Sequence, residues 1–261
     1  MEHLDSLSAE KAAKLSFILT DIDDTLTNDG KVLPEAYSAM WDLCNAGVGV
    51  LPVTGRPAGW CDMIARFWPV EGVVGENGAF VFYMDHGRMQ RMYHPDADKE
   101  QASDRLRDLL KRVLDTIPDS RVAEDQFCRM FDLAIDYREQ PPFLGLEEAE
   151  KIREVCEKAG AQAKTSSIHV NAWFGEYDKL SMTRLFFSRR YPTCNLQEEV
   201  LFVGDSPNDE PMFEFFPLSC GVGNIRQFLS QMNAMPAFLT KNKGGLGFTE
   251  LVERVLRFRT T

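Results

Sequence analysis

The sequence has no close cysteine pair, no long apolar run and no dense cluster of basic residues. The cysteines are Cys44, Cys61, Cys128, Cys156, Cys194 and Cys220. They show neither a CxxC pair nor a Cys/His spacing typical of zinc sites, so we interpret them as free thiols in a reducing compartment. Segment 1–14 is charged and lacks the apolar core of a secretory signal, and no apolar run approaches the length of a membrane span. We therefore expect a cytoplasmic protein without a membrane partner.

The formal net charge of the 261 residues is −11, and the basic residues are spread along the chain. Because nucleic-acid binding depends mostly on cationic contacts to phosphate, this balance argues against a nucleic-acid partner. An anionic ligand would need local cations, a metal ion or helix N-termini to offset the carboxylates. The length suits one large domain or two modest ones, and it leaves the oligomeric state open.

Short apolar runs alternate with helical patterns along most of the chain. This alternation predicts βα units and an α/β fold with a mostly parallel, Rossmann-like sheet. Pro52 lies inside one of the runs and counts against a central strand there, because proline removes a hydrogen-bond donor. The predicted strands are 15–20, 48–53, 72–74, 79–83, 129–136, 168–173, 200–204 and 218–222, and the predicted helices are 34–46, 57–68, 97–116, 146–159, 180–191, 208–216 and 245–259.

The middle of the chain has a different pattern. Segments 83–96 and 121–137 are richer in polar and aromatic residues, and the second ends in an alternation of polar and apolar side chains. Alternation gives a strand one solvated face and favours an antiparallel sheet. We therefore predict an inserted α+β module at 84–178, between two core segments at 1–83 and 179–261.

Three carboxylates follow the first predicted strand, in the sequence Asp21-Ile22-Asp23-Asp24-Thr25. Such a cluster of anions is costly unless a metal ion or a shared proton neutralises it. Asp21 has the chemistry of a nucleophile and Asp23 that of an acid/base, because carboxylates form covalent phosphoryl intermediates. The alternative is an acidic turn in which Asp24 or Thr25 caps a following helix.

Three further segments are expected to meet this cluster, because the carboxyl ends of parallel strands share one edge of a sheet. Thr54-Gly55-Arg56-Pro57 offers a hydroxyl and backbone donors to an anion at the start of a helix. Lys179 offers a cation, and the segment 204–209 carries further carboxylates after an all-apolar run. Taken singly, these are also readable as a strand-to-helix turn, a surface lysine and a capping turn. Together and in this order, they indicate one anion site.

These motifs resemble the haloacid dehalogenase superfamily of phosphatases, in its Cof-like, sugar-phosphatase branch with a large inserted cap (subfamily IIB). The resemblance covers residues 15–82 and 179–250. Lys179 departs from the usual Lys-Gly pair because Leu180 follows it. The matching residues are Asp21, Asp23 and Thr25 of Asp-x-Asp-x-Thr, Thr54 of the second motif, Gly204, Asp205, Asn208 and Asp209 of Gly-Asp-x-x-Asn-Asp, and the run Glu76-Asn77-Gly78-Ala79.

The resemblance implies stepwise phosphoryl transfer through an aspartyl phosphate. Asp21 would attack phosphorus, and Asp23 would protonate the leaving alcohol and then activate water. Thr54, Gly55 and Lys179 would hold the phosphoryl oxygens. Arg56 and Asn208 are expected to support the site. The implied cofactor is Mg²⁺, a hard cation that suits oxygen ligands, and its implied ligands are Asp21, the Asp23 backbone carbonyl, Asp205 and, directly or through water, Asp209.

The predicted module contains a polar and aromatic tract that is suited to a sugar. In an extended strand, Ser167, His169, Asn171 and Trp173 share one face, and the resemblance places this tract in the cap that reads the leaving group. Arg129 and Arg138 are candidate sources of positive charge there. A solvated sheet face with a structural tryptophan is the alternative.

We therefore predict a magnesium-dependent phosphatase of a small phosphorylated metabolite, with a sugar phosphate as the favoured substrate. One rival is a sugar phosphomutase, which shares the branch and the aspartate pair. The other is a non-catalytic protein that binds a metal or a sugar phosphate, although such a sensor has no need of the acid/base Asp23. The fold leaves the substrate and the pathway open.

Overall fold

Six parallel strands form the central sheet of the protein. The computed structural model describes residues 1–259, apart from the side chains of 99–102. Every neighbouring pair in this sheet runs parallel. The predicted parallel α/β core is therefore confirmed. In spatial order the strands are β1 (Glu2–His3), β15 (Phe238–Leu239), β14 (Ser219–Gly221), β13 (Val200–Gly204), β2 (Phe17–Thr20) and β5 (Gly49–Pro52).

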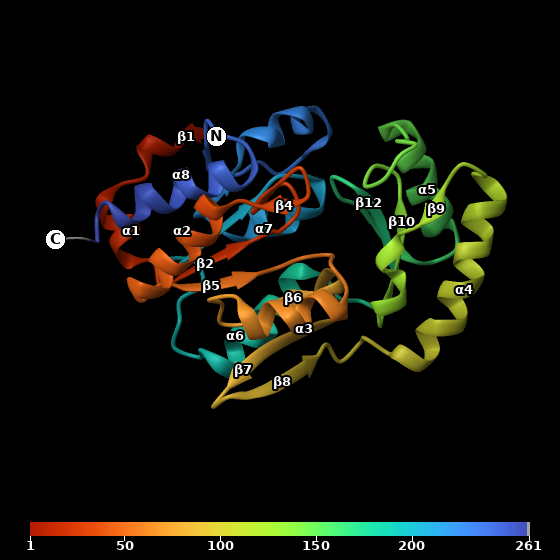
Figure 1. The fold of residues 1–261 in the computed structure, drawn as a ribbon, viewed down its shortest axis with the longest axis horizontal. Helices are drawn as coiled ribbons and strands as arrows, with labels where there is room; N and C mark the ends of the chain where they lie inside the picture. The colour runs from red at the N-terminus through yellow and green to blue at the C-terminus, as the bar shows by residue number, and fades with distance from the viewer. Residues whose placement is uncertain (260–261) are drawn as a thin grey trace.

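Helices cover both faces of the parallel sheet (Figure 1). Successive side chains of a strand point to opposite faces, so Ile18 and Leu19 of β2 enter different apolar clusters. The cluster around Ile18 includes α1 (Ala9–Lys14), α2 (Pro34–Asn45), α3 (Ala58–Phe67) and α8 (Gly244–Leu256). The cluster around Leu19 includes α6 (Lys179–Arg190) and α7 (Glu210–Phe215). Because both faces are covered, the strands read as continuous apolar runs.

Pro52 is the last residue of β5 and pairs with Thr20 of β2. The Gly49 amide donates to the Ser16 carbonyl just before β2, and the Val53 amide donates to the Thr20 carbonyl of β2. Because successive residues of a strand alternate in direction, the nitrogen of residue 52 faces away from β2. The missing donor therefore breaks no hydrogen bond between β2 and β5. Beyond this edge, one parallel bridge joins Val53 to Val74 of an antiparallel sheet made of β6 (Val73–Gly75), β7 (Phe80–Asp85) and β8 (Arg88–Tyr93).

A second, antiparallel sheet lies apart from the central one, beside the helices α4 (Lys99–Thr116) and α5 (Leu146–Lys158) (Figure 1). Leu133 and Ile135 of this sheet join the apolar cluster under the two helices. Asp132 and Asp136 alternate with them and lie on the other face. The predicted division of the chain at 83/84 and 178/179 stays a prediction. In spatial order the strands are β11 (Gln162–Thr165), β12 (His169–Trp173), β10 (Asp132–Asp136) and β9 (Arg121–Val122).

Among the elements that the sequence patterns did not predict are α1, β1, β8, β9, β11 and β15. The strands β1, β9 and β15 have only two residues each, which is too short for a periodic signal. No helix in the described chain is long and apolar enough to cross a membrane. The remaining elements are the hairpin β3 (Thr27–Asn28) with β4 (Lys31–Val32), and the 3-10 turns η1 (Leu4–Ser6), η2 (Glu76–Gly78), η3 (Glu124–Cys128), η4 (Pro207–Asp209), η5 (Gly223–Gln227) and η6 (Leu229–Gln231).

Candidate active site

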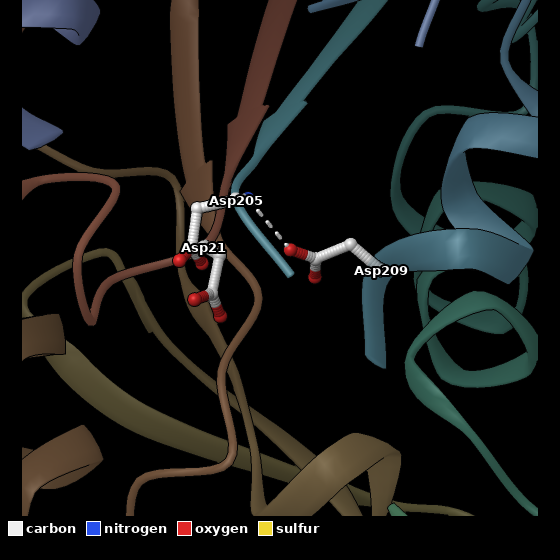
Figure 2. A group of neighbouring side chains, drawn as sticks. All are labelled: Asp21, Asp205 and Asp209. Atoms are coloured by element: carbon white, nitrogen blue, oxygen red, sulfur yellow. Dashed lines mark hydrogen bonds between the residues drawn. The ribbon is translucent and has the colours of Figure 1, made fainter. Parts of the chain in front are cut away.

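Two neighbouring strands end at the centre of the parallel sheet and place their aspartates together. Thr20 of β2 pairs with Val203 of β13, and the Asp21 amide donates to the Val203 carbonyl at 3.0 Å. Asp21 and Asp205 consequently lie side by side just beyond the strand ends (Figure 2). Both are buried, at 5% and 0% exposed. Asp209 completes a group in which one carboxylate oxygen of each residue lies within 4.8 Å of those of the other two.

Asp209 reaches this group from the short turn η4. One of its carboxylate oxygens accepts the Asp205 amide at 3.0 Å, which Figure 2 shows as a dashed line. That oxygen would lie 2.3 Å from a β-carbon at position 204, so only glycine fits there. Gly204 therefore lets the turn fold back onto the strand end, and this fixes the spacing between Asp205 and Asp209.

Lys179 is the cation inside the group of aspartates. It is the first residue of α6, and its ammonium donates to Asp21 Oδ1 and to Asp209 Oδ1, each at 2.8 Å. Burial alone would lower the pKa of Lys179, but the two carboxylates outweigh it and raise the pKa. Burial raises the pKa of Asp21 to about 7 in spite of the lysine. The predicted nucleophile and the predicted phosphate ligand are thus in direct contact.

The charge balance of this cluster favours a divalent cation. Asp21, Asp205 and Asp209 are set against the single ammonium of Lys179, and burial raises the pKa of Asp205 well above its ordinary value. Three buried carboxylates that converge offer the hard oxygen donors that Mg²⁺ prefers. The donor set therefore fits the predicted cofactor, and the assignment of Asp21, Asp205 and Asp209 as its ligands stays a prediction. Both oxygens of Asp209 also accept hydrogen bonds within the protein, from Lys179 and from the Asp205 amide.

The side chain of Asp23 faces a different partner. Arg56 donates to both of its carboxylate oxygens, at 2.8 to 3.1 Å. The same guanidinium donates to Asp125 at 3.2 Å and to Glu139 at 2.8 Å, and it lies 4.3 Å from the ring centre of Trp60. Whether the Asp23 carbonyl binds the metal stays a prediction.

The predicted phosphate loop is held from both sides. The Thr54 hydroxyl accepts the Arg56 amide at 3.0 Å, and the Gly55 carbonyl accepts from Arg129 at 2.7 Å.

Asn208 belongs to η4, where its side chain accepts from the Ser206 hydroxyl at 2.8 Å. Asn208 also lines a cleft of about 610 Å³ that runs between α5 and β11 on one side and residues 207–233 on the other.

The three predicted substrate residues of β12 are all buried, and each has a different partner. His169 Nε2 lies 2.8 Å from Glu139, and Asn171 donates to Asp132 at 3.0 Å. The Trp173 indole donates to the Tyr177 carbonyl at 3.0 Å and packs in the main apolar cluster. Ser167 is buried as well, and Arg138 is exposed. His169 therefore connects to Arg56 through Glu139, whereas Trp173 bonds to Tyr177 and packs in the main apolar cluster.

Comparisons with known proteins agree with this arrangement. A sequence model of haloacid dehalogenase-like hydrolases matches residues 18–119. The chain is 28% identical to a phosphoglycolate phosphatase of Methanobrevibacter smithii over 91% of this chain and 97% of that protein. It is 23% identical to phosphoglycolate phosphatase 1 of Saccharolobus solfataricus over 93% of this chain and 96% of the relative.

The fold is also found in a solved HAD/COF-like hydrolase from Plasmodium vivax, with a TM-score of 0.70 and 16% identity. That match covers 96% of this chain and 99% of the solved one. Both the matched family model and the shared fold are those of haloacid dehalogenase-like hydrolases. The predicted family is thereby confirmed, and with it an enzyme of the hydrolase type.

Sequence patterns missed several polar residues of this haloacid dehalogenase-like site. Asn224, from the turn η5, donates to Asp205 Oδ2 at 3.0 Å. The Glu76 carboxylate accepts the amides of Ala58, Met130 and Phe131. Asp125 and Glu139 contact Arg56 from the segment around the second sheet. The run that contains Glu76 carries a family resemblance, but the partners of these residues are 18 to 83 positions away, beyond any local pattern.

Proposed function

We propose that this hydrolase is a magnesium-dependent phosphatase of a small phosphorylated metabolite, acting through an aspartyl phosphate on Asp21. The observation that carries the proposal is the double contact of the Lys179 ammonium with Asp21 and Asp209 at 2.8 Å, beside the buried Asp205. Phosphoryl transfer needs mainly positioning and charge stabilisation, and this cluster provides both.

In the proposed reaction, an oxygen of Asp21 attacks phosphorus while the ester oxygen of the substrate leaves. Asp23 gives a proton to that oxygen, so the alcohol departs neutral. Asp23 then accepts a proton from the water that attacks the phosphorus of the aspartyl phosphate, and the P–O bond to Asp21 breaks. Inorganic phosphate is released, and both carboxyl groups return to their starting states.

Other groups of this chain position the reactants. Lys179, Thr54 and the Gly55 amide would bind the phosphoryl oxygens, and Arg56 fixes the rotamer of Asp23 by its two-pronged contact. Mg²⁺ bound by Asp21 and Asp205 would neutralise charge on the phosphoryl group. Six free cysteines fit the proposed cytoplasmic location.

A sugar phosphate is the proposed substrate class. Asp125 and Glu139 lie around Arg56, and carboxylates are good acceptors for sugar hydroxyls. His169 stands next to Glu139 and would add a ring nitrogen to this surface. Arg56 is bonded to Asp23, so a leaving group next to Asp23 would lie within reach of these side chains.

A phosphorylated hydroxy acid is the second candidate substrate. Two curated relatives are named phosphoglycolate phosphatases. Arg56 and His169, which both contact Glu139 in this structure, would bind the carboxylate of such a substrate if Glu139 turned away. The two candidates make opposite demands on Glu139, since a hydroxyl needs it as an acceptor and a carboxylate is repelled by it.

The test is phosphate release from sugar phosphates, phosphoglycolate and other phosphometabolites, with Mg²⁺ and with a chelator. Asp21→Asn is the control, because the amide removes the nucleophile with little change in volume. We expect release that requires Mg²⁺ and is lost in Asp21→Asn. Release that is equal in the mutant would exclude Asp21 as the nucleophile. Isomerisation of a sugar phosphate only when a bisphosphate is added would replace the phosphatase by a mutase.

A further inference from the structure

Asn224 joins three separate segments at the rear of the aspartate cluster. Its side-chain nitrogen donates to Asp205 Oδ2 at 3.0 Å and to the Asp24 carbonyl at 2.9 Å. Its side-chain oxygen accepts the Gly244 amide, at the start of α8, at 2.9 Å. The side-chain amide of Asn224 thus donates one hydrogen bond to the loop after β2 and one to the loop after β13. These two loops carry the proposed metal ligands.

The orientation of the Asn224 amide follows from its surroundings. The Gly244 N–H can only donate, so the side-chain oxygen must face it. The backbone carbonyl of Asp24 can only accept a hydrogen bond, and the same holds for the carboxylate of Asp205 when it is ionised. The side-chain nitrogen of Asn224 must therefore face both of them. Asparagine meets this pattern, because an aspartate here would place a carboxylate against two acceptors.

The backbone around Asn224 is fitted to this position. A β-carbon on the preceding residue, Gly223, would lie 2.7 Å from the Asn242 carbonyl and 2.8 Å from that of Lys241. The Gly223 amide donates to the same Asn242 carbonyl at 2.8 Å. This close approach holds the turn η5 against the segment before α8 and places Asn224 between α8 and the aspartates.

From these contacts we infer that Asn224 is a positioning residue for the metal site, which holds Asp205 in the rotamer that presents its other oxygen to Mg²⁺. The inference rests on the proposed function, because it assigns a role toward the proposed cofactor. The other oxygen of Asp205 has only a long contact, 3.4 Å, from the Thr25 hydroxyl. The hydrogen bond from Asn224 is therefore shorter than the one from Thr25 to the same carboxylate. The second hydrogen bond of Asn224, to the Asp24 carbonyl, holds the loop that carries Asp21 next to Asp205.

The test measures Mg²⁺ binding directly, by calorimetry and by the rise in melting temperature across a Mg²⁺ titration, in the wild type, Asn224→Ala and Asn224→Ser. Neither replacement can bridge Asp24 and Asp205, because alanine has no donor and the serine hydroxyl is too short and has only one. Asn45→Ala is the matched control, at an exposed position of α2. We expect the Kd for Mg²⁺ to rise about 10- to 100-fold in both Asn224 variants, the loss typical of groups that orient metal ligands.

The outcomes separate this inference from the proposed function. Wild-type affinity for Mg²⁺ in either folded Asn224 variant would overturn the positioning role while leaving the phosphatase intact. If the wild type itself shows no Mg²⁺ binding, the proposed cofactor fails, and the inference fails with it. If Asn224→Ala does not fold, as judged by circular dichroism without metal, Asn224→Ser decides. Should both variants unfold, the side chain is required for the fold itself, and the inference is rejected.

Discussion

The guanidinium of Arg56 holds both carboxylate oxygens of Asp23, at distances of 2.8 to 3.1 Å. The arginine is 4% exposed, so the pair is shielded from water. Its remaining donors reach Asp125 and Glu139, which come from the segment around the second sheet. The proposed acid/base Asp23 is thus oriented by Arg56, which also contacts Asp125 and Glu139, the residues proposed to bind the leaving group of the substrate.

Replacing Arg56 by lysine is expected to lower kcat while leaving Mg²⁺ binding unchanged. An ammonium lacks the planar fork that grips two carboxylate oxygens, so Asp23 loses its fixed orientation. A displacement of this kind costs up to about 100-fold in rate. Steady-state kinetics on the best substrate provide the measurement, with Arg66→Lys as the control, because Arg66 pairs with Asp62 on the exposed side of α3. Unchanged kcat in Arg56→Lys would remove the orienting role.

The Asp23→Ala variant is expected to bind Mg²⁺ and to lose turnover. The carboxylate of Asp23 lies outside the group of Asp21, Asp205 and Asp209 that is proposed to hold the metal, so metal affinity should persist. Loss of the general acid and base lowers kcat by about 10²- to 10⁴-fold. Mg²⁺ titration and phosphate release measure the two properties, with the exposed Asp42→Ala as the control. Near-normal turnover in Asp23→Ala would take Asp23 out of the mechanism.

The contribution of Glu139 to stability is expected to vanish in acid. Burial alone would raise its pKa, but the His169 hydrogen bond and the Arg56 charge outweigh it and lower the pKa from 4.5 to about 2. A carboxyl with a lowered folded-state pKa stabilises the protein above its unfolded pKa and loses that contribution as the pH falls through the folded value. The wild type should therefore exceed Glu139→Gln in unfolding free energy at pH 7.

The size of that difference is at most about 3 kcal/mol, and less after screening, because a quarter of the side chain is exposed. Chemical denaturation at a series of pH values measures it. The gap between wild type and Glu139→Gln should narrow from pH 5 toward pH 2, and the exposed Glu147→Gln should show no such gap. A difference that stays constant down to pH 2 would contradict the charge-based explanation.

Glu76→Gln is expected to destabilise the fold. The carboxylate is fully buried and accepts backbone amides from Ala58, at the start of α3, and from Met130 and Phe131. All of these groups donate, so the NH₂ of glutamine would face an N–H group. The cost should be about 2 to 3 kcal/mol in unfolding free energy, measured by denaturant titration against the exposed Glu214→Gln. Wild-type stability in Glu76→Gln would show that these contacts contribute little.

The strand and helix patterns of the core were readable from local sequence because they depend on short-range periodicity. The runs that form β2, β13 and β14 are mostly apolar, as is typical of buried parallel strands, and the structure places each within about two residues of its expected range. Pro52 counted against a central strand, and β5 is the outermost strand of the parallel sheet. A local pattern does not reveal which side of β5 the nitrogen of residue 52 faces.

The tract at 166–173 shows where local periodicity ends. The alternation correctly indicated that His169, Asn171 and Trp173 lie on one face of a strand. It did not indicate that Trp173 bonds to Tyr177 while His169 reaches Glu139, because those contacts depend on how the neighbouring segments pack.

The sequence by itself determined the chemistry of this protein: aspartates directly after two buried strands, a threonine and glycine after a third, and a lysine at the start of a helix. Chain direction and parallel pairing bring such groups to one edge of a sheet, so their meeting follows from the pattern. Only the tertiary structure decided that Arg56 grips Asp23, that Glu76 ties α3 to the Met130 segment, and that Asn224 holds Asp205. These bonds join residues 18 to 54 positions apart, and no local propensity encodes which distant donor will face a given carboxylate once the layers have packed.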